Sequence, residues 1–257
     1  MAQDFEGQVA IVTGGSDGIG LATASLLAER GAQVVICGRR QQLLDNAREV
    51  IAAEGGKVET IRLDVADDSA LVVMIEETAR KYGRIDMLVN NAMSTHYAPI
   101  SKLTLDHWRK DFAVNADAVF VSTKAAMKVM AAAGKGSIVN IASTCGIRAT
   151  ANMASYSASK AALIHFTAVA AMEGARLGIR VNAIVPGQVQ TAGTEEFSAR
   201  APDIAARTAD AIPMGRGGQP VELAQAIVFM LSDAASYITG TALPVDGGKA
   251  AQLYMPS

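Results

Sequence analysis

Cysteine is scarce in this sequence, with Cys37 and Cys145 as the only two among 257 residues. Two cysteines cannot build a disulfide scaffold, so reduced thiols in a cytoplasmic protein are expected. Long hydrophobic runs are also missing, because no apolar stretch approaches the roughly 20 residues that span a bilayer. The N-terminal residues contain neither the basic region nor the apolar region of a signal peptide. We therefore predict a cytoplasmic location and no membrane partner.

Charge of one sign is equally lacking. The formal net charge is −2 and there is no basic run, which argues against nucleic acid as the main partner. His96, His107 and His165 are isolated and lack carboxylates at paired spacing, so no metal site is predicted. There is no Pro/Ser-rich linker, charge block or repeat, and half of the residues are apolar. One domain over residues 1–257, with one large core, is expected.

Short apolar runs alternate with helical patterns along the chain. We predict buried strands over residues 9–13, 33–37, 58–63, 85–89, 137–142, 179–185 and 241–245. Helices are predicted over residues 21–30, 41–54, 104–132, 153–177 and 221–232, with another between Asp67 and Gly83. This alternation predicts an α/β fold, a Rossmann-type doubly wound parallel sheet of about seven strands with helices on both faces. Residues 188–218 form a long predicted loop, which we interpret as a substrate lid.

A glycine-rich turn joins the first predicted strand to the first predicted helix. It runs Gly14-Gly15-Ser16-Asp17-Gly18-Ile19-Gly20. Glycine lets the backbone approach a pyrophosphate closely, and the free N–H groups and dipole at a helix start favour its negative charge. Strand, glycine turn and helix form the context that a dinucleotide fingerprint requires. The alternative is a tight turn that binds no ligand.

The residues after the second predicted strand bear on the identity of the dinucleotide. In such a fold the adenosine ribose lies there and a carboxylate would bind its 2′-hydroxyl, but residues 38–40 are Gly-Arg-Arg. Arg39 can hold a 2′-phosphate instead, because the planar guanidinium is bidentate and always charged. Asp17 in the glycine turn counts against a phosphate nearby, and a pair of solvated arginines is the alternative. NADP is therefore favoured, with NAD possible.

The candidate catalytic residues lie between positions 115 and 160. Tyr156 and Lys160 are four positions apart, so they share one face of their predicted helix. A phenol has a reference pKa of roughly 10, and a nearby ammonium favours the phenolate, which makes the pair a tunable proton donor and acceptor. Ser143 follows a predicted strand, where open α/β sheets place ligands. Asn115 lies inside a predicted helix, where asparagine competes with backbone bonding, so its functional interpretation is a deliberate disturbance of the helix. Taken alone, the Tyr–Lys spacing is weak, and a solvated pair is the alternative.

Together these motifs resemble a classical short-chain dehydrogenase/reductase over about residues 7 to 248. They are, in chain order, Thr13-Gly14-x-x-x-Gly18-Ile19-Gly20, Asp64-Val65, Asn90-Asn91-Ala92, Asn115, Ser143, Tyr156-x-x-x-Lys160 and Pro186-Gly187-x-x-x-Thr191. The resemblance implies an NADP(H)-dependent oxidoreductase that interconverts a carbonyl compound and a secondary alcohol by hydride transfer. An NAD-dependent alcohol or hydroxysteroid-type dehydrogenase is the alternative. A non-catalytic nucleotide-binding regulator is a third interpretation, from another class.

The resemblance also implies roles for individual residues. Tyr156 is expected to be the general acid/base, and Lys160 to lower its pKa and bind the nicotinamide ribose. Ser143 is expected to donate to the substrate carbonyl oxygen, and Asn115 to hold a water that connects Lys160 with solvent. The expected cofactor-binding residues are Gly14, Ser16, Asp17, Gly18, Ile19, Gly20, Arg39, Asp64, Val65, Asn91, Tyr156, Lys160, Pro186, Gly187 and Thr191.

The pocket and the partners are less defined by the sequence. Met93 stands where the family usually has glycine, and it can either reshape the pocket or fill the core. His96 and Tyr97 follow the fourth predicted strand and can touch substrate, whereas Cys145 is expected to be an inert packing residue. Relatives are commonly tetramers built on the two alanine-rich helices. The predicted partners are therefore a small carbonyl or alcohol substrate and three further copies of the chain.

Overall fold

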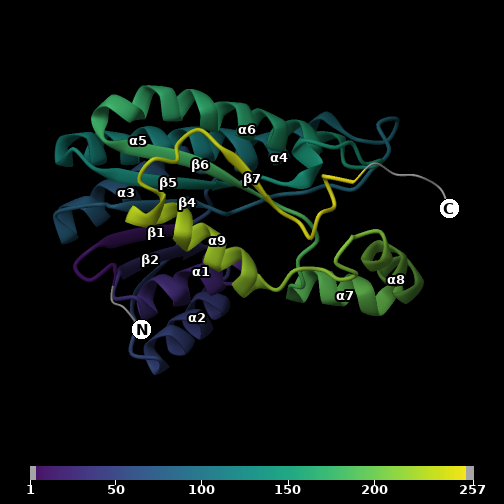
Figure 1. The fold of residues 1–257 in the computed structure, drawn as a ribbon, viewed down its shortest axis with the longest axis horizontal. Helices are drawn as coiled ribbons and strands as arrows, with labels where there is room; N and C mark the ends of the chain where they lie inside the picture. The colour runs from purple at the N-terminus through teal and green to yellow at the C-terminus, as the bar shows by residue number, and fades with distance from the viewer. Residues whose placement is uncertain (1–3, 253–257) are drawn as a thin grey trace.

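Seven parallel strands form one sheet in the computed structural model, which describes residues 4–252. Their spatial order is β3-β2-β1-β4-β5-β6-β7 (Figure 1). The strands are β1 (Val9–Thr13), β2 (Gln33–Gly38), β3 (Lys57–Arg62), β4 (Met87–Asn90), β5 (Gly136–Ile141), β6 (Ile179–Pro186) and β7 (Ala242–Val245). Each overlaps one of the seven predicted strands, so the predicted doubly wound parallel sheet is confirmed.

Helices connect the strands and cover both faces of the sheet (Figure 1). They are α1 (Gly18–Glu29), α2 (Gln41–Ala53), α3 (Asp68–Tyr82), α4 (Leu105–Phe112), α5 (Ala118–Ala133), α6 (Ala154–Gly174), α7 (Ala192–Arg200), α8 (Pro202–Asp210) and α9 (Pro220–Leu231). The helix α3 begins and ends where the sequence predicted, with a capping residue at each end. Asp67 accepts from the Ala70 N–H, and Gly83 ends the helix with a φ of 75°.

The central strands are buried on both faces, which explains their continuous apolar sequence. Every residue of β1, β4 and β5 is buried. One core lies between the sheet and α1, α2 and α9, and includes Leu27, Leu44 and Ile227. A second core lies between the opposite face and α3, α5 and α6, and includes Ile75 and Met130. Two packed faces hold the carboxyl ends of the strands in fixed positions.

The predicted helix over residues 104–132 is interrupted. It consists of α4, a π-helical turn named η1 (Ala113–Asp117), and α5. Asn115 is buried inside this turn. A π turn has one extra residue per hydrogen-bonded ring, and such turns often occur at functional sites. The disturbance that the sequence predicted at Asn115 is therefore present, although one continuous helix was the wrong description.

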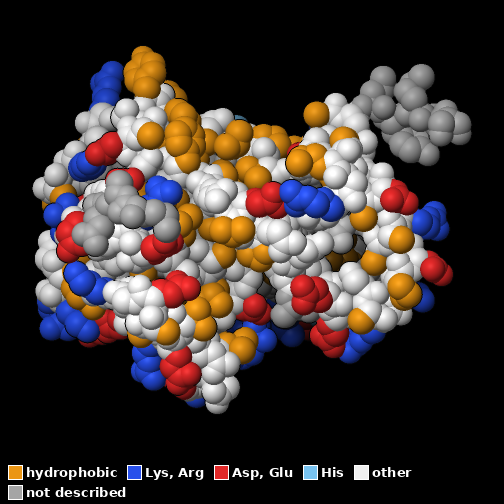
Figure 2. Space-filling model, turned by 60° about the horizontal axis from the view of Figure 1, so that its bottom comes forward, with side chains coloured by type: hydrophobic (Ala, Val, Ile, Leu, Met, Phe, Trp, Pro, Cys, Tyr) orange, Lys and Arg blue, Asp and Glu red, His pale blue; other side chains and the backbone are white. Residues whose placement is uncertain are grey.

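The region over residues 188–218, predicted to be one long loop, contains two helices, α7 and α8, so the prediction of a loop throughout was wrong. Pro202 begins α8, where its missing N–H breaks no helical hydrogen bond. The short polar sequence gave no extended apolar pattern that could have announced either helix. Figure 1 shows α7 and α8 standing apart from the layered body, and Figure 2 shows a hollow on the same side of the molecule. Their role as a lid stays a prediction.

The first three strands are added toward one edge of the sheet, and from β4 onward they are added toward the other edge. The switch point is β1, which pairs with β2 on one side and with β4 on the other. In open α/β sheets, ligands bind outside the carboxyl ends of the strands at such a switch point. Gly14 follows β1, Asn91 follows β4, and Ser143 lies two residues after β5. The fold thus brings the predicted site residues to one edge. Within residues 4–252, no helix has the length and apolar character needed to cross a membrane.

Candidate active site

The glycine turn after β1 packs closely against the chain that follows β4. Gly14 has a φ of 64°, and a Cβ there would lie 3.0 Å from the Ala92 Cα. A Cβ on Gly20 would lie 2.2 Å from the Gly14 carbonyl oxygen. Neither position accepts a side chain without movement of the backbone. Asp17 caps α1 by accepting from the Gly18 N–H at 2.7 Å. The turn therefore presents bare backbone at a helix start, as a pyrophosphate requires.

Asn91 braces this turn with its side-chain amide. Its Nδ2 donates to the carbonyl oxygens of Thr13 and Gly14, both at 3.0 Å. The Thr13 hydroxyl accepts from the backbone N–H groups of Asn91 and Ala92 at 3.0 and 3.1 Å. These bonds join the end of β1 to the end of β4. The structure thus places Asn91 at the crevice, with its amide nitrogen already committed to holding the crevice in shape.

Two arginines and two carboxylates cluster near the end of β2. Arg39 Nη1 lies 3.9 Å from Asp64 Oδ2, and Arg40 Nη2 lies 3.8 Å from Asp17 Oδ2. All four side chains are exposed, so these ion pairs are weak in water and easily exchanged for other partners. Asp17, which counted against a phosphate in the sequence, is partnered by Arg40. Sequence reasoning gave Arg40 no role, although it directly follows Arg39.

Three further residues predicted to bind the cofactor are Ser16, Ile19 and Val65, and the structure shows what each packs against. Ser16 Oγ lies 3.2 Å from the position of a Cβ on Gly38, so the turn and the end of β2 are in contact. Ile19 is partly buried and packs against the core beneath α1. Val65 is buried beside the second core. Their contact with the cofactor stays a prediction.

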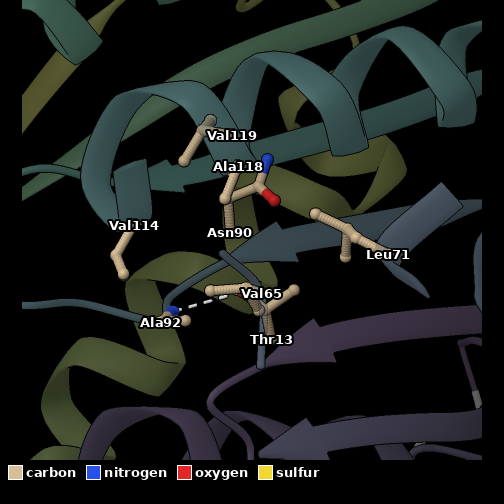
Figure 3. A pocket seen from close by; sticks show the side chains of 8 residues that line it. All are labelled: Thr13, Val65, Leu71, Asn90, Ala92, Val114, Ala118 and Val119. Carbon is tan, nitrogen blue, oxygen red and sulfur yellow. Dashed lines mark hydrogen bonds between the residues drawn. The ribbon is translucent and has the colours of Figure 1, made fainter. Parts of the chain in front are cut away.

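A small, mainly apolar pocket lies on the glycine-turn side of the crevice (Figure 3). Its lining residues are Thr13, Val65, Leu71, Asn90, Ala92, Val114, Ala118 and Val119. The dashed line in Figure 3 is the hydrogen bond from the Ala92 N–H to the Thr13 hydroxyl. Ser143, Tyr156 and Lys160 do not line this pocket. The pocket therefore lies between the ends of β1 and β4 and the π turn that contains Asn115.

Ser143, Tyr156 and Lys160 meet at the end of β5. Ser143 is extended and its Oγ accepts from the Cys145 N–H at 3.1 Å. Tyr156 stands in the first turn of α6 and Lys160 in the next turn. The Lys160 Nζ lies 5.7 Å from the centroid of the Tyr156 ring and donates to the Ile141 carbonyl oxygen at 2.7 Å. The solvated pair that the sequence left open as an alternative is excluded, because Lys160 is only 2% exposed.

Burial determines how this pair holds protons. It raises the pKa of Tyr156 to about 12, against a hydrogen bond with Ser143 that lowers it. Burial also lowers the pKa of Lys160 to about 7. The expectation that Lys160 makes the phenol more acidic stays a prediction for the protein with its cofactor bound. An amine whose pKa lies near 7 carries only part of a positive charge at neutral pH, and a partial charge favours the phenolate less than a full one.

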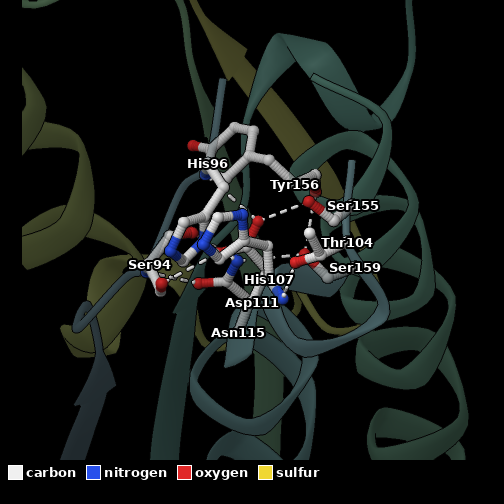
Figure 4. Close-up of polar contacts among 9 residues, drawn as sticks. All are labelled: Ser94, His96, Thr104, His107, Asp111, Asn115, Ser155, Tyr156 and Ser159. Atoms are coloured by element: carbon white, nitrogen blue, oxygen red, sulfur yellow. Dashed lines mark hydrogen bonds and ion pairs between the residues drawn. The ribbon is translucent and has the colours of Figure 1, made fainter. Parts of the chain in front are cut away.

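The side chain of Asn115 is committed to protein partners (Figure 4). Its Nδ2 donates to the Ser94 carbonyl oxygen at 2.8 Å and to the Ser159 hydroxyl at 3.0 Å. Its Oδ1 accepts from the Ser94 N–H at 2.9 Å. Ser159 donates in turn to the Tyr156 carbonyl oxygen at 2.8 Å. Asn115 thus ties the π turn to the part of α6 that carries Tyr156. Both amide hydrogens are used, so a water here would have to bind other groups, such as backbone carbonyls of the π turn.

The segment that leaves β6 returns to the glycine turn. Thr191 Cγ2 lies 3.0 Å from the position of a Cβ on Gly18, so Thr191 lies across the crevice from the start of α1. Gly187 packs against Asp246, where a Cβ would lie 2.9 Å from the Asp246 Cα. Thr191 is held by its N–H, which donates to the Thr194 hydroxyl at 2.7 Å. The segment that begins at Pro186 thus faces the turn, as predicted for residues that bind one ligand.

The prediction that the histidines are isolated was wrong for two of them. His96 Nδ1 lies 2.7 Å from Asp111 Oδ1, and the His96 ring stacks on His107 with centroids 4.3 Å apart (Figure 4). Asp111 is fully buried and also accepts from the hydroxyls of Ser94 and Ser155 at 2.8 and 2.5 Å. The pair joins a loop to a helix, which no local spacing reveals. The i, i+4 spacing of His107 and Asp111 was the one available signal.

The residues that follow β4 are exposed, whereas the two cysteines are partly or fully buried. Met93 is 50% exposed, which excludes the alternative of a core filler. Tyr97 and Ile100 are 72% and 81% exposed, so the chain after β4 presents an apolar surface beside the crevice. Cys145 is half-buried and Cys37 is buried, and burial raises the pKa of the Cys37 thiol to about 12. Cys37 is therefore an unreactive core thiol.

Known proteins resemble this chain along almost its entire length. A family model described as "Enoyl-(Acyl carrier protein) reductase" matches residues 14–250. The chain is 39% identical over 248 residues to 2,5-dichloro-2,5-cyclohexadiene-1,4-diol dehydrogenase LinX of Sphingobium indicum, covering 96% of this chain and 98% of that protein. It is 40% identical over 249 residues to cis-4-hydroxycyclohexanecarboxylate dehydrogenase of Sinomonas cyclohexanicum, again covering 96% and 98%.

A solved structure from Beutenbergia cavernae has the same fold. It is provisionally described as an NAD(P)-dependent gluconate 5-dehydrogenase, with NADP bound at low occupancy. It matches this structure with a TM-score of 0.92 and 38% sequence identity, covering 98% of this chain and 100% of that chain.

Proposed function

The chain belongs to the short-chain dehydrogenase/reductase family and is an NAD(P)-dependent enzyme acting on CH–OH or C=O groups. From that premise we propose that it interconverts a carbonyl compound and a secondary alcohol with NADP(H). Tyr156 is the general acid/base of this reaction, and Ser143 binds the reacting oxygen. The observation that carries the proposal is the cluster at the end of β5, where a buried Lys160 lies 5.7 Å from the Tyr156 ring. Burying an amine beside a phenol lowers the free energy of unfolding, and titratable groups buried at such a cost are typical of catalytic sites.

The chain's own residues fit a nicotinamide dinucleotide. The bare backbone of the turn from Gly14 to Gly20 would hold the pyrophosphate, because a Cβ on Gly20 would close that space. Lys160 uses one of its three N–H donors on the Ile141 carbonyl, and residues 4–252 supply no other acceptor, which leaves two for the nicotinamide ribose. Thr191, opposite Gly18, would contact the carboxamide. When bound, the dinucleotide supplies or accepts the hydride.

Tyr156 transfers the proton. In the reductive direction its phenol donates a proton to the carbonyl oxygen of the substrate, and in the oxidative direction its phenolate accepts the proton of the alcohol. Ser143 donates a hydrogen bond to the same oxygen and stabilises negative charge there. The raised pKa of Tyr156 keeps it protonated at neutral pH, which suits reduction. Oxidation requires a more acidic phenol, and a positive charge brought beside the ring would lower its pKa.

Lys160 and Asn115 support Tyr156 in different ways. Burial places the pKa of Lys160 near 7, so its amine can gain and lose a proton at physiological pH. It is therefore suited to pass protons toward Tyr156 as well as to bind ribose. Asn115 acts through structure, because its hydrogen bonds to Ser94 and Ser159 fix the first turn of α6. A displaced first turn would move the phenol away from the reacting oxygen.

Arg39 supports NADP as the preferred cofactor. It lies at the end of β2 and is 74% exposed, so its guanidinium is free to turn from Asp64 toward a 2′-phosphate. Arg40 adds a second positive charge and neutralises Asp17. NAD is the second candidate, because Asp17 and Asp64 are carboxylates at the same edge and each can accept from a ribose hydroxyl or an adenine amine.

The substrate class is suggested by the relatives and by the surface after β4. The two curated relatives are named for ring alcohols, and we infer that this chain also acts on an alicyclic alcohol or ketone. Met93, Tyr97 and Ile100 would supply apolar contacts to such a ring. The helices α7 and α8 would close over it as a lid, with Ile204 and Met214 as exposed apolar residues on that side.

The homotetramer remains a proposal about the helices α5 and α6. Phe120, Val169 and Met172 on these helices are 52%, 44% and 81% exposed. Exposed apolar side chains on long helices are typical of subunit interfaces. Sedimentation of the purified protein would give the number of subunits directly. The cytoplasmic location likewise remains a prediction from the sequence.

The proposed function is tested by incubating the protein with a panel of ketones and secondary alcohols and each of the four nicotinamide cofactors. We expect turnover of at least one cyclic ketone, with a higher kcat/KM for NADPH than for NADH. Tight cofactor binding without hydride transfer to any compound would favour the non-catalytic regulator instead. A higher kcat/KM for NADH than for NADPH would support the proposed reaction but identify NAD(H) as the preferred cofactor.

A further inference from the structure

A buried carboxylate close to Tyr156 has no role in hydride or proton transfer as described above. Asp111 on α4 is 0% exposed. It accepts from the Ser94 hydroxyl at 2.8 Å, the Ser155 hydroxyl at 2.5 Å and the His96 backbone N–H at 3.2 Å. Burial would raise the pKa of Asp111, but hydrogen bonds from Ser155, His96 and Ser94 together lower it, so the group is an anion. Burying an anion is costly, and the structure retains it with four hydrogen bonds.

The fourth of these bonds fixes the ring of His96. Its Nδ1 lies 2.7 Å from Asp111 Oδ1, and the opposite ring nitrogen, Nε2, has no hydrogen bond from residues 4–252. One face of the ring stacks on His107, with centroids 4.3 Å apart and an interplanar angle of 12°. The ring is thus held at one edge and on one face. The His96 side chain is 28% exposed while Asp111 is buried, so part of the ring is open to solvent.

The held ring lies on a segment that is joined to the start of α6, which carries Tyr156. Ser155, which donates to Asp111, directly precedes Tyr156 in α6. The chain two residues after His96 pairs with the start of α6, where the Ala98 N–H donates to the Asn152 carbonyl oxygen at 2.9 Å. The negative charge of Asp111 is also near enough to raise the pKa of Tyr156. Figure 4 shows the His96 and His107 rings and the Tyr156 phenol in one cluster around Asp111.

We propose, on the basis of the function proposed above, that His96 binds a second oxygen of the substrate through Nε2, so that the preferred substrates carry a hydroxyl or carbonyl oxygen besides the one that reacts. Asp111 is a positioning residue that holds the ring in place. With Nδ1–H donated to Asp111, a neutral ring accepts from a substrate hydroxyl at Nε2, and a protonated ring donates to an oxygen there. Diols, hydroxyketones and diketones have this second oxygen, and simple alcohols lack it.

A metal site and a purely structural pair account less well for the cluster. A metal site is not indicated, because no group of three His, Cys, Asp or Glu side chains within residues 4–252 is arranged to hold an ion. A purely structural pair uses Nδ1 and one face of the ring, and it gives no role to Nε2, which has no hydrogen bond from residues 4–252. The substrate-binding role predicts a dependence on the second oxygen, and the structural role does not.

The test compares matched substrates in the full-length protein. Cyclohexanol and the cyclohexanediol isomers would be assayed with NADP⁺, and the ratio of kcat/KM for each diol to that for cyclohexanol recorded. Wild type should prefer at least one diol by about 10-fold, the effect of one well-made hydrogen bond. His96→Phe keeps a ring that can stack but has no nitrogen, so this preference should fall to about 2-fold or less. His96→Gln keeps a polar end and should retain part of the preference.

A matched control is His165→Gln, the same exchange at an exposed position on α6 outside the cluster. It should keep the wild-type diol ratio. Asp111→Asn should raise KM for the diol more than for cyclohexanol, because the ring is less well held. Loss of the Asp111 charge also lowers the pKa of Tyr156, and this effect on kcat should be the same for the two substrates. If wild type prefers no diol, or if His96→Phe lowers kcat/KM for diol and cyclohexanol equally, the inference is overturned. If wild type oxidises none of these alcohols and reduces none of the matching ketones, the proposed function itself fails.

Discussion

Lys160 and Tyr156 face each other across 5.7 Å, from ammonium nitrogen to ring centroid, and burial shifts their pKa values toward the uncharged forms of both. The Lys160 amine donates to the Ile141 carbonyl, and within residues 4–252 no hydrogen bond joins it to the phenol oxygen. The polypeptide therefore prepares a protonated phenol beside an amine that is easily deprotonated. This arrangement makes proton transfer from Tyr156 dependent on what else is bound in the crevice.

The first prediction concerns the ionisation of Tyr156. Ultraviolet titration of wild type minus Tyr156→Phe should give a pKa well above 10 for the free protein, because burial disfavours the phenolate. In the presence of saturating NADP⁺ the same difference titration should give a lower pKa, since positive charge beside the ring stabilises the phenolate. A phenol that already titrates below pH 9 in the free protein would contradict the role of burial.

The second prediction is that Lys160→Met stabilises the protein while it abolishes turnover. A buried amine whose pKa falls from 10.5 to about 7 weakens folding at neutral pH, because the unfolded chain binds the proton more tightly. Methionine of similar length removes this penalty and leaves the Ile141 carbonyl with one donor fewer. Chemical denaturation at pH 7 should show a gain of about 1–4 kcal/mol in the free energy of unfolding. An unchanged or lower value would show that Lys160 is not desolvated as described.

The third prediction follows from the sign of the same shift. Between about pH 7 and pH 10.5 the unfolded chain binds more protons at this position than the folded chain, so wild type gains stability from Lys160 as the pH rises. Lys160→Met lacks this gain, whereas all other groups titrate equally in both proteins. The stability advantage of the variant should therefore shrink between pH 7 and pH 9.5. If the difference in the free energy of unfolding between Lys160→Met and wild type is constant with pH, the Lys160 amine is solvated and its pKa is not lowered by burial.

The fourth prediction concerns cofactor choice. Arg39→Ala should lower kcat/KM for NADPH by about 10- to 100-fold and leave that for NADH within about 3-fold, because one charged hydrogen-bonded contact to phosphate is lost. Arg48→Ala is the matched control, since Arg48 is an exposed arginine on α2 that pairs with Asp45. Equal losses with both cofactors would remove Arg39 from the 2′-phosphate site.

The fifth prediction concerns the backbone cradle. Gly20→Ala should destabilise the protein by about 2–3 kcal/mol and weaken NADP⁺ binding at least 10-fold, because its Cβ would lie 2.2 Å from the Gly14 carbonyl oxygen. Gly193→Ala on α7 is the control, since its Cβ would meet no atom within 4 Å. Thermal unfolding and calorimetric titration of both variants measure the two effects. Normal NADP⁺ affinity in a folded Gly20→Ala protein would place the pyrophosphate elsewhere.

The sheet was readable from sequence because its strands are buried on both faces. The continuous apolar runs of β1, β4 and β5 follow directly from that burial. The meeting of Ser143, Tyr156 and Lys160 also followed, since helical spacing and the end of a parallel strand bring them to one edge. Local pattern was sufficient for the strands and for the start of α6, but not for α7, α8 or the break between α4 and α5.

The remaining features depend on contacts that local pattern does not encode. The π turn at Asn115 is maintained by hydrogen bonds to Ser94 and Ser159, which lie 21 and 44 positions away. The link between His96 and Asp111 joins a loop to a helix. The pKa directions of Tyr156 and Lys160 depend on how deeply the fold buries them, which a four-residue spacing does not encode.

The central claim is that Tyr156 transfers the proton in a site whose cofactor-binding residues act independently of its hydroxyl. The most direct measurement is the kcat of Tyr156→Phe for the best ketone, together with its Kd for NADPH, beside Tyr82→Phe as a control on α3. We predict that kcat of Tyr156→Phe falls by about 10²- to 10⁴-fold while the Kd for NADPH stays within about 3-fold of wild type. A Tyr156→Phe protein that keeps more than about a tenth of the wild-type kcat would contradict the claim.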